Sequence, residues 1–312
     1  MLRWVPKNTN LDFAGKRYLA FALSAIILLG SLFLLFSKGL NFGIDFTGGT
    51  LIEIQVTQEA PDLTELRNEL NTLELGNISI QEFGAPNDLL IRLPQQGEDP
   101  FAQQEAIESV KEKLDEIFEE GLDYRRIEFV GPQVGEELKQ KGMYAVLFSI
   151  LGMLVYIWFR FEWQFSAAAI AALIHDSLAT IGLFALTQME FNLSTVAAIL
   201  MIAGYSINDT VVVFDRIREN LRKFKKMPVG ELLNKSINQT LSRTIMTSIT
   251  TLLALIALWA FGGEVIRGFV NALIFGIVIG TYSSVFVAAP ILTFLNIRHK
   301  KPETETKETI EA

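Results

Sequence analysis

The chain has 312 residues, half of them hydrophobic, with a formal net charge of −8 and no cysteine, and its mean hydropathy is positive at +0.32. This composition excludes an ordinary soluble domain, a disulfide framework and a thiolate metal site. Because the balance of charge is acidic, nothing indicates nucleic-acid binding, and we expect a protein embedded in a lipid bilayer.

Six apolar runs approach the ~20 residues that an α-helix needs to cross the hydrocarbon core of a membrane. The predicted spans are 18–36, 141–159, 165–187, 193–214, 243–260 and 268–295. The first follows Lys16 and Arg17, as the core of a signal peptide would. At about 19 residues it is longer than such a core, and no small-residue cleavage site follows. We therefore interpret it as a retained membrane anchor, with the other five helices in 141–295.

Lysine and arginine residues predict the orientation, because they are enriched on the cytoplasmic flanks of membrane helices. They are concentrated in the N-terminal segment 1–17, in the segment 215–242 and in the C-terminal tail 296–312. With six spans these three segments fall on one side, so we expect both termini to be cytoplasmic. The segment 215–242 is predicted to be a basic, partly amphipathic loop on the membrane surface.

The segment 37–140 falls on the opposite side and is predicted to be one external domain between the first two helices. Alternating apolar residues indicate strands near 50–56, 78–83, 89–93 and 124–130, with helical spacing after Asp62 and again from 106 to 118. The order β-α-β-β-α-β predicts a ferredoxin-like α+β fold. Its sequence contains no Ser-His-Asp set, histidine cluster or phosphate loop, so we expect a docking or substrate-contacting module rather than an enzyme.

Asp209 lies within the fourth predicted span. A charged group at such a depth costs roughly 2.5–3.5 kcal/mol on insertion scales and usually marks a conduction path or a buried pair. We predict that Asp209 is a proton-relay residue, with Ser206 and Asn208 supporting the site. The alternative is a structural carboxylate that is hydrogen-bonded to Asn208 or Ser206.

Arg243 opens the fifth span and is the predicted partner of Asp209. Asp209 lies roughly 9 Å inside the end of its own helix, at 1.5 Å per residue, and an arginine side chain can cover most of that depth. Thr247, one turn after Arg243, begins a stripe of hydroxyl groups and is a candidate secondary relay. The alternatives are that Arg243 only obeys the positive-inside rule and that the hydroxyls bond their own backbone.

Asp176 lies near the middle of the third span, beside His175. It is either a secondary relay group or a structural tie between helices, and the sequence leaves both interpretations open. Neighbouring side chains on a helix point about 100° apart, so the two residues are not expected to act as one ligand pair, and we predict no metal or other cofactor. Gly276 and Gly280 form a Gly-x-x-x-Gly pair, which predicts close helix packing.

A short glycine motif, Gly43-Ile44-Asp45-Phe46-Thr47-Gly48-Gly49, follows the first span. By itself it predicts a turn between the membrane and external parts, and we count Asp45, Gly48 and Gly49 among the residues that support the site. It resembles the Gly-x-Asp-Phe-x-Gly-Gly motif of the SecD/SecF family of protein-export membrane proteins. The run 206–220 resembles the hallmark of that family in and after its fourth span, and 238–244 resembles the segment that opens the fifth. Ser177 departs from the aliphatic residue that the family pattern has there.

The resemblance implies a multi-pass protein of the bacterial cytoplasmic (inner) membrane that forms a complex with SecD. It further implies association with the SecYEG channel, an indirect relation to SecA, contact with exported polypeptides, and use of the proton-motive force to assist late export. Asp209 and Arg243 would then matter for proton conduction. Two other functions stay open: half of a related proton-coupled small-molecule efflux pump, and a passive assembly scaffold. Such pumps usually have twelve spans and two external inserts in one chain.

Overall fold

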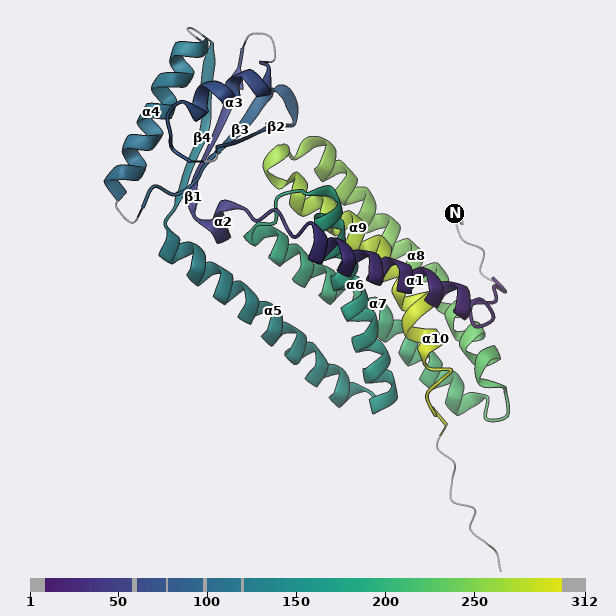
Figure 1. The fold of residues 1–312 in the computed structure, drawn as a ribbon. Coiled ribbons are helices and arrows are strands. Elements are labelled where there is room, and N and C mark those ends of the chain that lie inside the picture. Colours follow the sequence, from purple (N-terminus) through teal and green to yellow (C-terminus); the bar gives the residue numbers. More distant parts are fainter. Residues whose placement is uncertain (1–8, 58–60, 77, 98–99, 119–120, 299–312) are drawn as a thin grey trace, which may run out of the picture.

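The computed structural model describes residues 9–57, 61–76, 78–97, 100–118 and 121–298. Six helices in this part of the chain are long and apolar enough to cross a membrane, which confirms the predicted number. A four-stranded antiparallel sheet lies beyond one end of the helical bundle (Figure 1). The parts of the predicted cytoplasmic ends at 1–8 and 299–312 lie outside the described residues.

The first five long helices reach or extend beyond their predicted bounds, mainly at polar ends, whereas the sixth stops short of the predicted residue 295 even with its continuation to Ile291. The six long helices are α1 (Arg17–Ser37), α5 (Pro132–Arg160), α6 (Trp163–Thr187), α7 (Leu193–Lys223), α8 (Val229–Phe261) and α9 (Arg267–Ser283). A π-helical turn, Ser284–Ala288, continues α9 into the short helix α10 (Ala289–Ile291). In a regular α-helix the ring of Pro290 would clash with the carbonyl group of residue 286, and the wider turn accommodates it.

The segment 215–242 is not the loop that its charge predicts. Helix α7 continues to Lys223 and α8 begins at Val229, so only 224–228 connect them. The parts of α7 and α8 that lie within this segment are bonded to each other, because the side-chain amide of Asn220 donates to Ser236 Oγ at 2.8 Å and to Gln239 Oε1 at 2.9 Å. These buried polar contacts, together with apolar residues of α8 packed beneath them, stabilise the helices beyond the membrane-spanning length.

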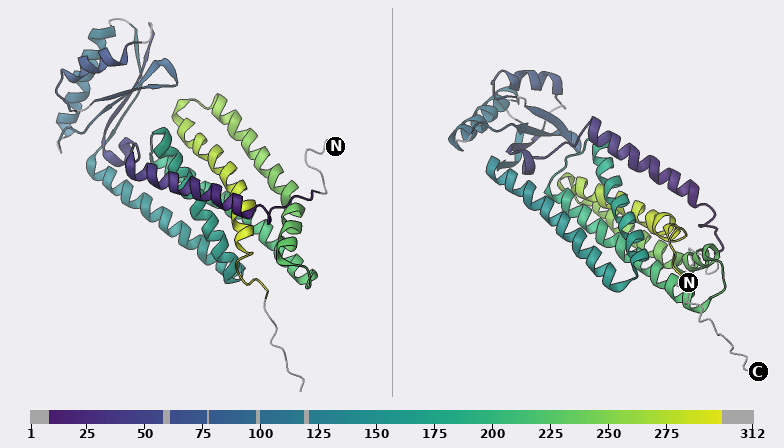
Figure 2. Two further views of the ribbon diagram at one scale, coloured as in Figure 1. Left: turned by 45° about the vertical axis from the view of Figure 1, so that its right-hand side comes forward. Right: turned by 60° about the horizontal axis from the view of Figure 1, so that its bottom comes forward.

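Helices α6, α7 and α9 form the centre of the bundle. Each is buried over half or more of its apolar window, whereas α1, α5 and α8 are buried over less than a fifth of theirs. Helix α1 packs along α6, and both α1 and α5 lie at the outside of the bundle (Figure 2). Any group that must be kept away from lipid therefore belongs on α6, α7 or α9.

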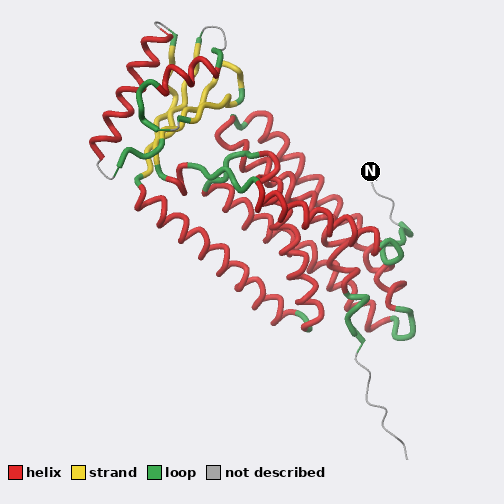
Figure 3. Tube along the Cα trace, viewed as in Figure 1, coloured by secondary structure: helices red, strands yellow, loops and turns green. Residues whose placement is uncertain are grey.

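The strands gather at one end of the molecule, apart from the long helices (Figure 3). We call this part the α/β unit; in chain order it consists of β1 (Gly49–Val56), α3 (Leu63–Asn71), β2 (Ser79–Phe83), β3 (Ala85–Leu93), α4 (Pro100–Phe118) and β4 (Leu122–Val130). The sheet order is β2-β3-β1-β4, and all neighbouring strands are antiparallel. Helices α3 and α4 cover one face, where Ile52, Ile54 and Ile91 are fully buried.

Helix α3 begins at a side-chain cap, which is Asp62, the residue that precedes the predicted helical spacing. Asp62 Oδ1 accepts hydrogen bonds from the backbone N–H groups of Thr64 at 2.7 Å and Glu65 at 3.4 Å. These bonds hold the pKa of the Asp62 carboxyl below its usual value, because they favour the ionised form. The α/β unit is joined to α1 through the short helix α2 (Ile44–Thr47), which follows the first glycine of the motif.

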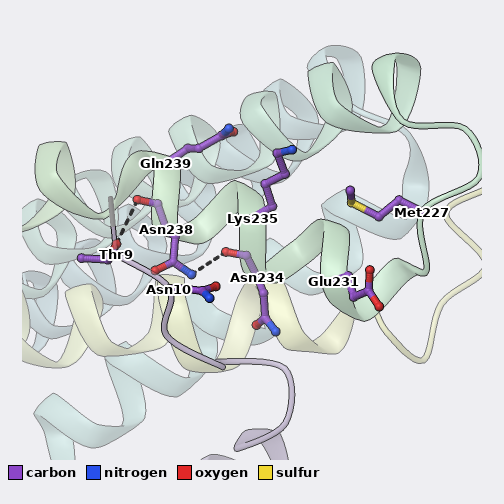
Figure 4. A pocket seen from close by; sticks show the side chains of 8 residues that line it. All are labelled: Thr9, Asn10, Met227, Glu231, Asn234, Lys235, Asn238 and Gln239. Carbon is purple, nitrogen blue, oxygen red and sulfur yellow. Dashed lines mark hydrogen bonds between the residues drawn. The ribbon is translucent and has the colours of Figure 1, made fainter. Parts of the chain in front are cut away.

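The N-terminal segment is bound along α8, at the end of the bundle remote from the sheet. Asn238 accepts the N–H of Leu11 at 3.0 Å and donates to its carbonyl oxygen at 2.9 Å. Asn234 accepts the N–H of Ala14 and donates to Asp12 Oδ1, both at 2.7 Å. Figure 4 shows the two asparagines beside a cavity of about 450 Å³. Two side-chain amides, one helical turn apart on α8, therefore hold the segment that leads into α1, mainly through its backbone.

Candidate functional site

Asp209 lies in the interior of the bundle, on the side of α7 that faces α8. Its Oδ1 accepts a hydrogen bond from Thr244 Oγ1 at 2.7 Å. Its Oδ2 is buried and has no hydrogen-bond partner among the described residues. Leaving a carboxylate oxygen unsatisfied in apolar surroundings is costly, and the few such groups in folded proteins call for a functional explanation. The free oxygen is a place where a proton can bind.

The predicted ion pair between Asp209 and Arg243 is not formed among the described residues. Arg243 lies on the exposed side of α8, and the next residue, Thr244, turns inward to Asp209 instead. Consecutive side chains on a helix point about 100° apart, so only one of the two can face α7 at a time. Asn208, predicted to support Asp209, is likewise exposed.

Thr247 is exposed on α8 and bonds its own helix, which is the alternative that the sequence left open for these hydroxyls. Its hydroxyl donates to the backbone carbonyl oxygens of Arg243 at 3.1 Å and Thr244 at 2.9 Å. Among the described residues, the Thr247 hydroxyl makes no hydrogen bond to a neighbouring helix. The geometry therefore offers no support for Thr247 as a secondary relay.

Asp176 is fully buried and ties three helices together. Its Oδ2 accepts hydrogen bonds from Ser206 Oγ of α7 at 2.5 Å and Ser283 Oγ of α9 at 2.7 Å. Its Oδ1 lies 2.9 Å from His175 Nδ1, so the two neighbours meet although their Cβ directions diverge. Ser206, predicted to support Asp209, thus bonds Asp176 instead.

Further hydroxyl groups connect the surroundings of the two carboxylates. Thr210 Oγ1, next to Asp209, lies 2.9 Å from Ser284 Oγ, and Ser284 follows Ser283, which bonds Asp176. We call this set the polar seam; its members are Asp176, Ser206, Asp209, Thr210, Thr244, Ser283 and Ser284. Thr210, Thr244, Ser283 and Ser284 were not singled out from the sequence, because an isolated serine or threonine in an apolar run usually bonds its own helix.

Gly276 and Gly280 bring α9 close to α7 at the polar seam, which confirms the close packing predicted for them. A Cβ atom on Gly276 would lie 2.3 Å from the side chain of Ile202, and one on Gly280 would lie 3.2 Å from Ser206 Cβ. Small residues let the backbones of membrane helices approach closely, and the resulting van der Waals packing stabilises the contact between the helices. This approach also brings Ser283 within reach of Asp176.

The glycine motif lies far from the polar seam, at the end of the bundle nearest the sheet. Asp45 Oδ2 accepts the backbone N–H of Leu193, the first residue of α7, at 2.8 Å. Asp209 is sixteen residues further along α7, or about 24 Å at 1.5 Å per residue. Asp45, Gly48 and Gly49 therefore do not contact Asp209 and can act on it only through the helix that carries it.

The fold and the polar seam together define a multi-pass membrane protein that buries two carboxylates inside its bundle. Residues 109–298 match the family "Protein export membrane protein SecD/SecF, C-terminal", and residues 33–60 match the "SecD/SecF GG Motif". These matches, with the full-length relatives below, show that the chain belongs to the SecD/SecF family of protein-export membrane proteins.

Two relatives illustrate the similarity in sequence. "Protein translocase subunit SecF" of Rickettsia rickettsii is 47% identical over 305 residues, covering 97% of this chain and 98% of the relative. The protein of the same name from Rickettsia prowazekii is 46% identical over 308 residues, covering 98% of both chains.

A solved structure illustrates the similarity in fold. The crystal structure of SecDF from Thermus thermophilus, described as a translocon-associated membrane protein, superposes with a TM-score of 0.83 at 36% identity. The match covers 94% of this chain and 40% of the SecDF chain, so this chain spans less than half of that protein.

Proposed function

We propose that this chain is the SecF subunit of a Sec protein translocase. In this role it works with SecD and uses the proton-motive force to assist late steps of export through SecYEG, with SecA involved indirectly. Similarity to SecF subunits over 97% of the chain supports the assignment. The observation that carries the proton-coupled mechanism is Asp209, whose Oδ2 is buried without a partner among the described residues. We assign the chain no enzymatic activity.

Asp209 is the group that binds and releases the proton in this proposal. When it is ionised, Thr244 stabilises it by donating the hydrogen bond at 2.7 Å. Arg243 is the next-door neighbour of Thr244 on α8, so rotating α8 about its axis replaces the hydroxyl by the guanidinium. A cation facing Asp209 favours proton release, and its withdrawal favours proton uptake. Asp176 stays a structural tie, because its two oxygens already have three partners.

SecD is the proposed partner for the outer faces of the bundle. Helix α5 exposes large apolar side chains such as Phe148, Trp158 and Phe159, and α8 exposes Arg243 together with Leu253. Lipid suits the apolar side chains, but an exposed arginine needs a polar partner. The related SecDF chain, of which this chain spans 40%, supports a complementary SecD half. The exported polypeptide would contact the α/β unit.

The α/β unit is proposed to be the external, periplasmic domain of the protein, with a ferredoxin-like fold. Its alternation of strands and helices and its antiparallel order β2-β3-β1-β4 support this fold. The segments 1–17, 215–242 and 296–312 would then lie in the cytoplasm of a bacterial cell, and 37–140 outside the inner membrane. The asymmetry of lysine and arginine supports this orientation.

Cysteine labelling tests the orientation cleanly, because the chain has no native cysteine. In spheroplasts, a membrane-impermeant thiol reagent is expected to modify Glu116→Cys in α4 and to leave Lys225→Cys, between α7 and α8, unmodified. Permeabilising the membrane should make both positions reactive. Modification of Lys225→Cys in sealed spheroplasts would show that the proposed orientation is inverted.

The proposed role in export predicts a defect late in translocation. In cells depleted of this chain, we expect secretory proteins to be targeted and inserted normally but to be released from the membrane severalfold more slowly. Pulse-chase labelling followed by protease protection measures both steps. Re-expression of the wild-type chain should restore release. Normal release kinetics in depleted cells would exclude this function.

A further inference from the structure

The first residue of α7 is held by the glycine motif. Leu193 donates its backbone N–H to Asp45 Oδ2 at 2.8 Å, across 148 residues of sequence. Within α7 itself, Asn192 caps the N–H of Thr195 at 3.1 Å. A carboxylate at this place satisfies one of the free N–H groups of the helix and complements the positive end of its dipole. The start of the helix that carries Asp209 is therefore fixed to α2.

Two backbone hydrogen bonds add to this connection. Gly43 donates its N–H to the carbonyl oxygen of Phe191 at 2.9 Å, and Phe191 donates its own to Asn41 at 2.8 Å. The rings of Phe42 and Phe46 pack against that of Phe191, with centroids 5.9 and 6.1 Å away. The segment before β1 and the connection between α6 and α7 thus form one small β-bridge.

An ion pair extends the connection to the sheet. Glu190, next to Phe191, accepts a hydrogen bond from Arg92 of β3 at 2.6 Å, and Arg92 also donates to Asn41 Oδ1 at 3.2 Å. Both charged side chains are mostly buried, with 13% and 21% exposed. The mutual attraction of the two charges is larger in such a shielded place than at an exposed one, and losing one partner would leave a poorly solvated charge.

The glycines of the motif are the residues that permit these contacts. A Cβ atom on Gly43 would lie 2.3 Å from Glu190 Oε1, and one on Gly49 would lie 2.5 Å from the carbonyl oxygen of Leu93. Gly48 and Gly49 also have φ angles of +71° and +112°, which side chains strongly disfavour. On the other side of α2, a Cβ on Gly135 of α5 would lie 3.2 Å from Gly48 N. A side chain at Gly43 would therefore displace the carboxylate of Glu190, and one at Gly49 would push the backbone of the motif away from the sheet.

We propose that the glycine motif is a rigid joint that couples the α/β unit to α7 and so to Asp209. The joint consists of residues 41–49, the connection 188–193 and Arg92. Asp45 and Glu190 are its positioning residues, because they act on the proton site only through α7. The inference rests on the proposed function, since it assigns the route by which proton binding at Asp209 moves the α/β unit.

Helix caps provide a matched test of the joint. Asp45→Ala removes the hydrogen bond that ties Leu193 of α7 to α2, while Asn192 still caps α7, whereas Asp62→Ala removes the cap of α3 inside the α/β unit, where no membrane helix depends on it. Both are assayed in vesicles that contain the whole complex, with proton uptake and gradient-driven export measured in parallel. Asp45→Ala should lower gradient-driven export about fivefold or more while proton uptake still occurs. Asp62→Ala should leave both nearly unchanged, and Asp45→Asn, which keeps an acceptor, should restore coupling.

The two readouts separate this inference from the proposed function. Asp209→Asn should lose proton uptake as well as gradient-driven export, whereas Asp45→Ala should lose only the export. If Asp209→Asn behaves like the wild type, the proposed function fails whatever the joint does. If Asp209→Asn loses both responses but Asp45→Ala keeps full export, the joint alone is refuted.

A cross-link tests the rigidity of the joint without removing a charge. Phe42 and Phe191 are paired in the β-bridge, so the variant Phe42→Cys/Phe191→Cys places two thiols opposite each other in a chain without native cysteine. A rigid joint predicts that forming the disulfide leaves gradient-driven export within about twofold of the reduced variant, within the scatter of a surface substitution. Loss of export on oxidation, restored by a reductant and absent from both single variants, would show that the bridge must open and would overturn the proposal.

Discussion

Asp209→Asn is expected to abolish the response of protein export to an imposed proton gradient, while the chain still inserts into the membrane and binds SecD. Asparagine has nearly the same size as aspartate and keeps an oxygen that can accept the hydrogen bond from Thr244, now 2.7 Å long. It cannot bind and release a proton. Because a buried acid is costly to keep in a membrane, we expect the variant to be at least as stable as the wild type. The measurement is export into inverted vesicles with and without the gradient.

The same helix provides a control for this substitution. Asp215→Asn, about 9 Å further along α7, removes a half-exposed ion pair with Arg160 at 2.9 Å and should respond to the gradient as the wild type does. Thr244→Val and Arg243→Lys should each weaken the response without abolishing it; the first loses the hydroxyl, the second the planar fork of the guanidinium. A full response by Asp209→Asn would mean that Asp209 is only structural.

The membrane helices could be predicted from the sequence because their signal is local and large. A run of about 20 apolar residues has few stable arrangements outside a membrane-spanning helix. For the same reason Asp209 could be recognised as buried in the membrane part without any knowledge of its neighbours. The hydrogen-bond partner of Asp209 could not be predicted in this way, because it depends on the rotation of α8 about its own axis. Thr244 and Arg243 are adjacent in sequence, and packing decides which of them turns inward.

Charge predicted the secondary structure less well, at the end of the bundle remote from the sheet. The many basic residues in 215–242 predict a surface loop, yet most of this segment is helical. A buried hydrogen bond between Asn220 and Ser236, 2.8 Å long, links two helices whose contact no local pattern reveals. Four hydroxyl-bearing members of the polar seam, Thr210, Thr244, Ser283 and Ser284, were missed for the same reason. Ser283 and Ser284 acquire their meaning only when Gly276 and Gly280 allow α9 to approach α7.

Substitutions of Asp176 distinguish between the two roles that the sequence left open, a structural tie between helices and a secondary relay group. As a structural tie, it matters for its hydrogen bonds to Ser206 at 2.5 Å and Ser283 at 2.7 Å rather than for its charge. Asp176→Leu would leave both hydroxyls and His175 without this partner, so we expect a loss of roughly 3–5 kcal/mol in unfolding free energy. Thermal unfolding in detergent and the yield of the SecD complex measure this loss.

Asp176→Asn tests the tie against a relay, because asparagine still accepts hydrogen bonds but does not titrate. One carbonyl oxygen can take the bonds from both serines, since it has two lone pairs. Its amide group then faces His175 Nδ1, the ring nitrogen that lies 2.9 Å from Asp176 Oδ1, and can donate to it when the ring proton is on Nε2. If the tie is its whole role, Asp176→Asn should unfold within about 1 kcal/mol of the wild type and keep the full response of export to the gradient. A stable Asp176→Asn protein that has lost this response would establish Asp176 as a second relay group.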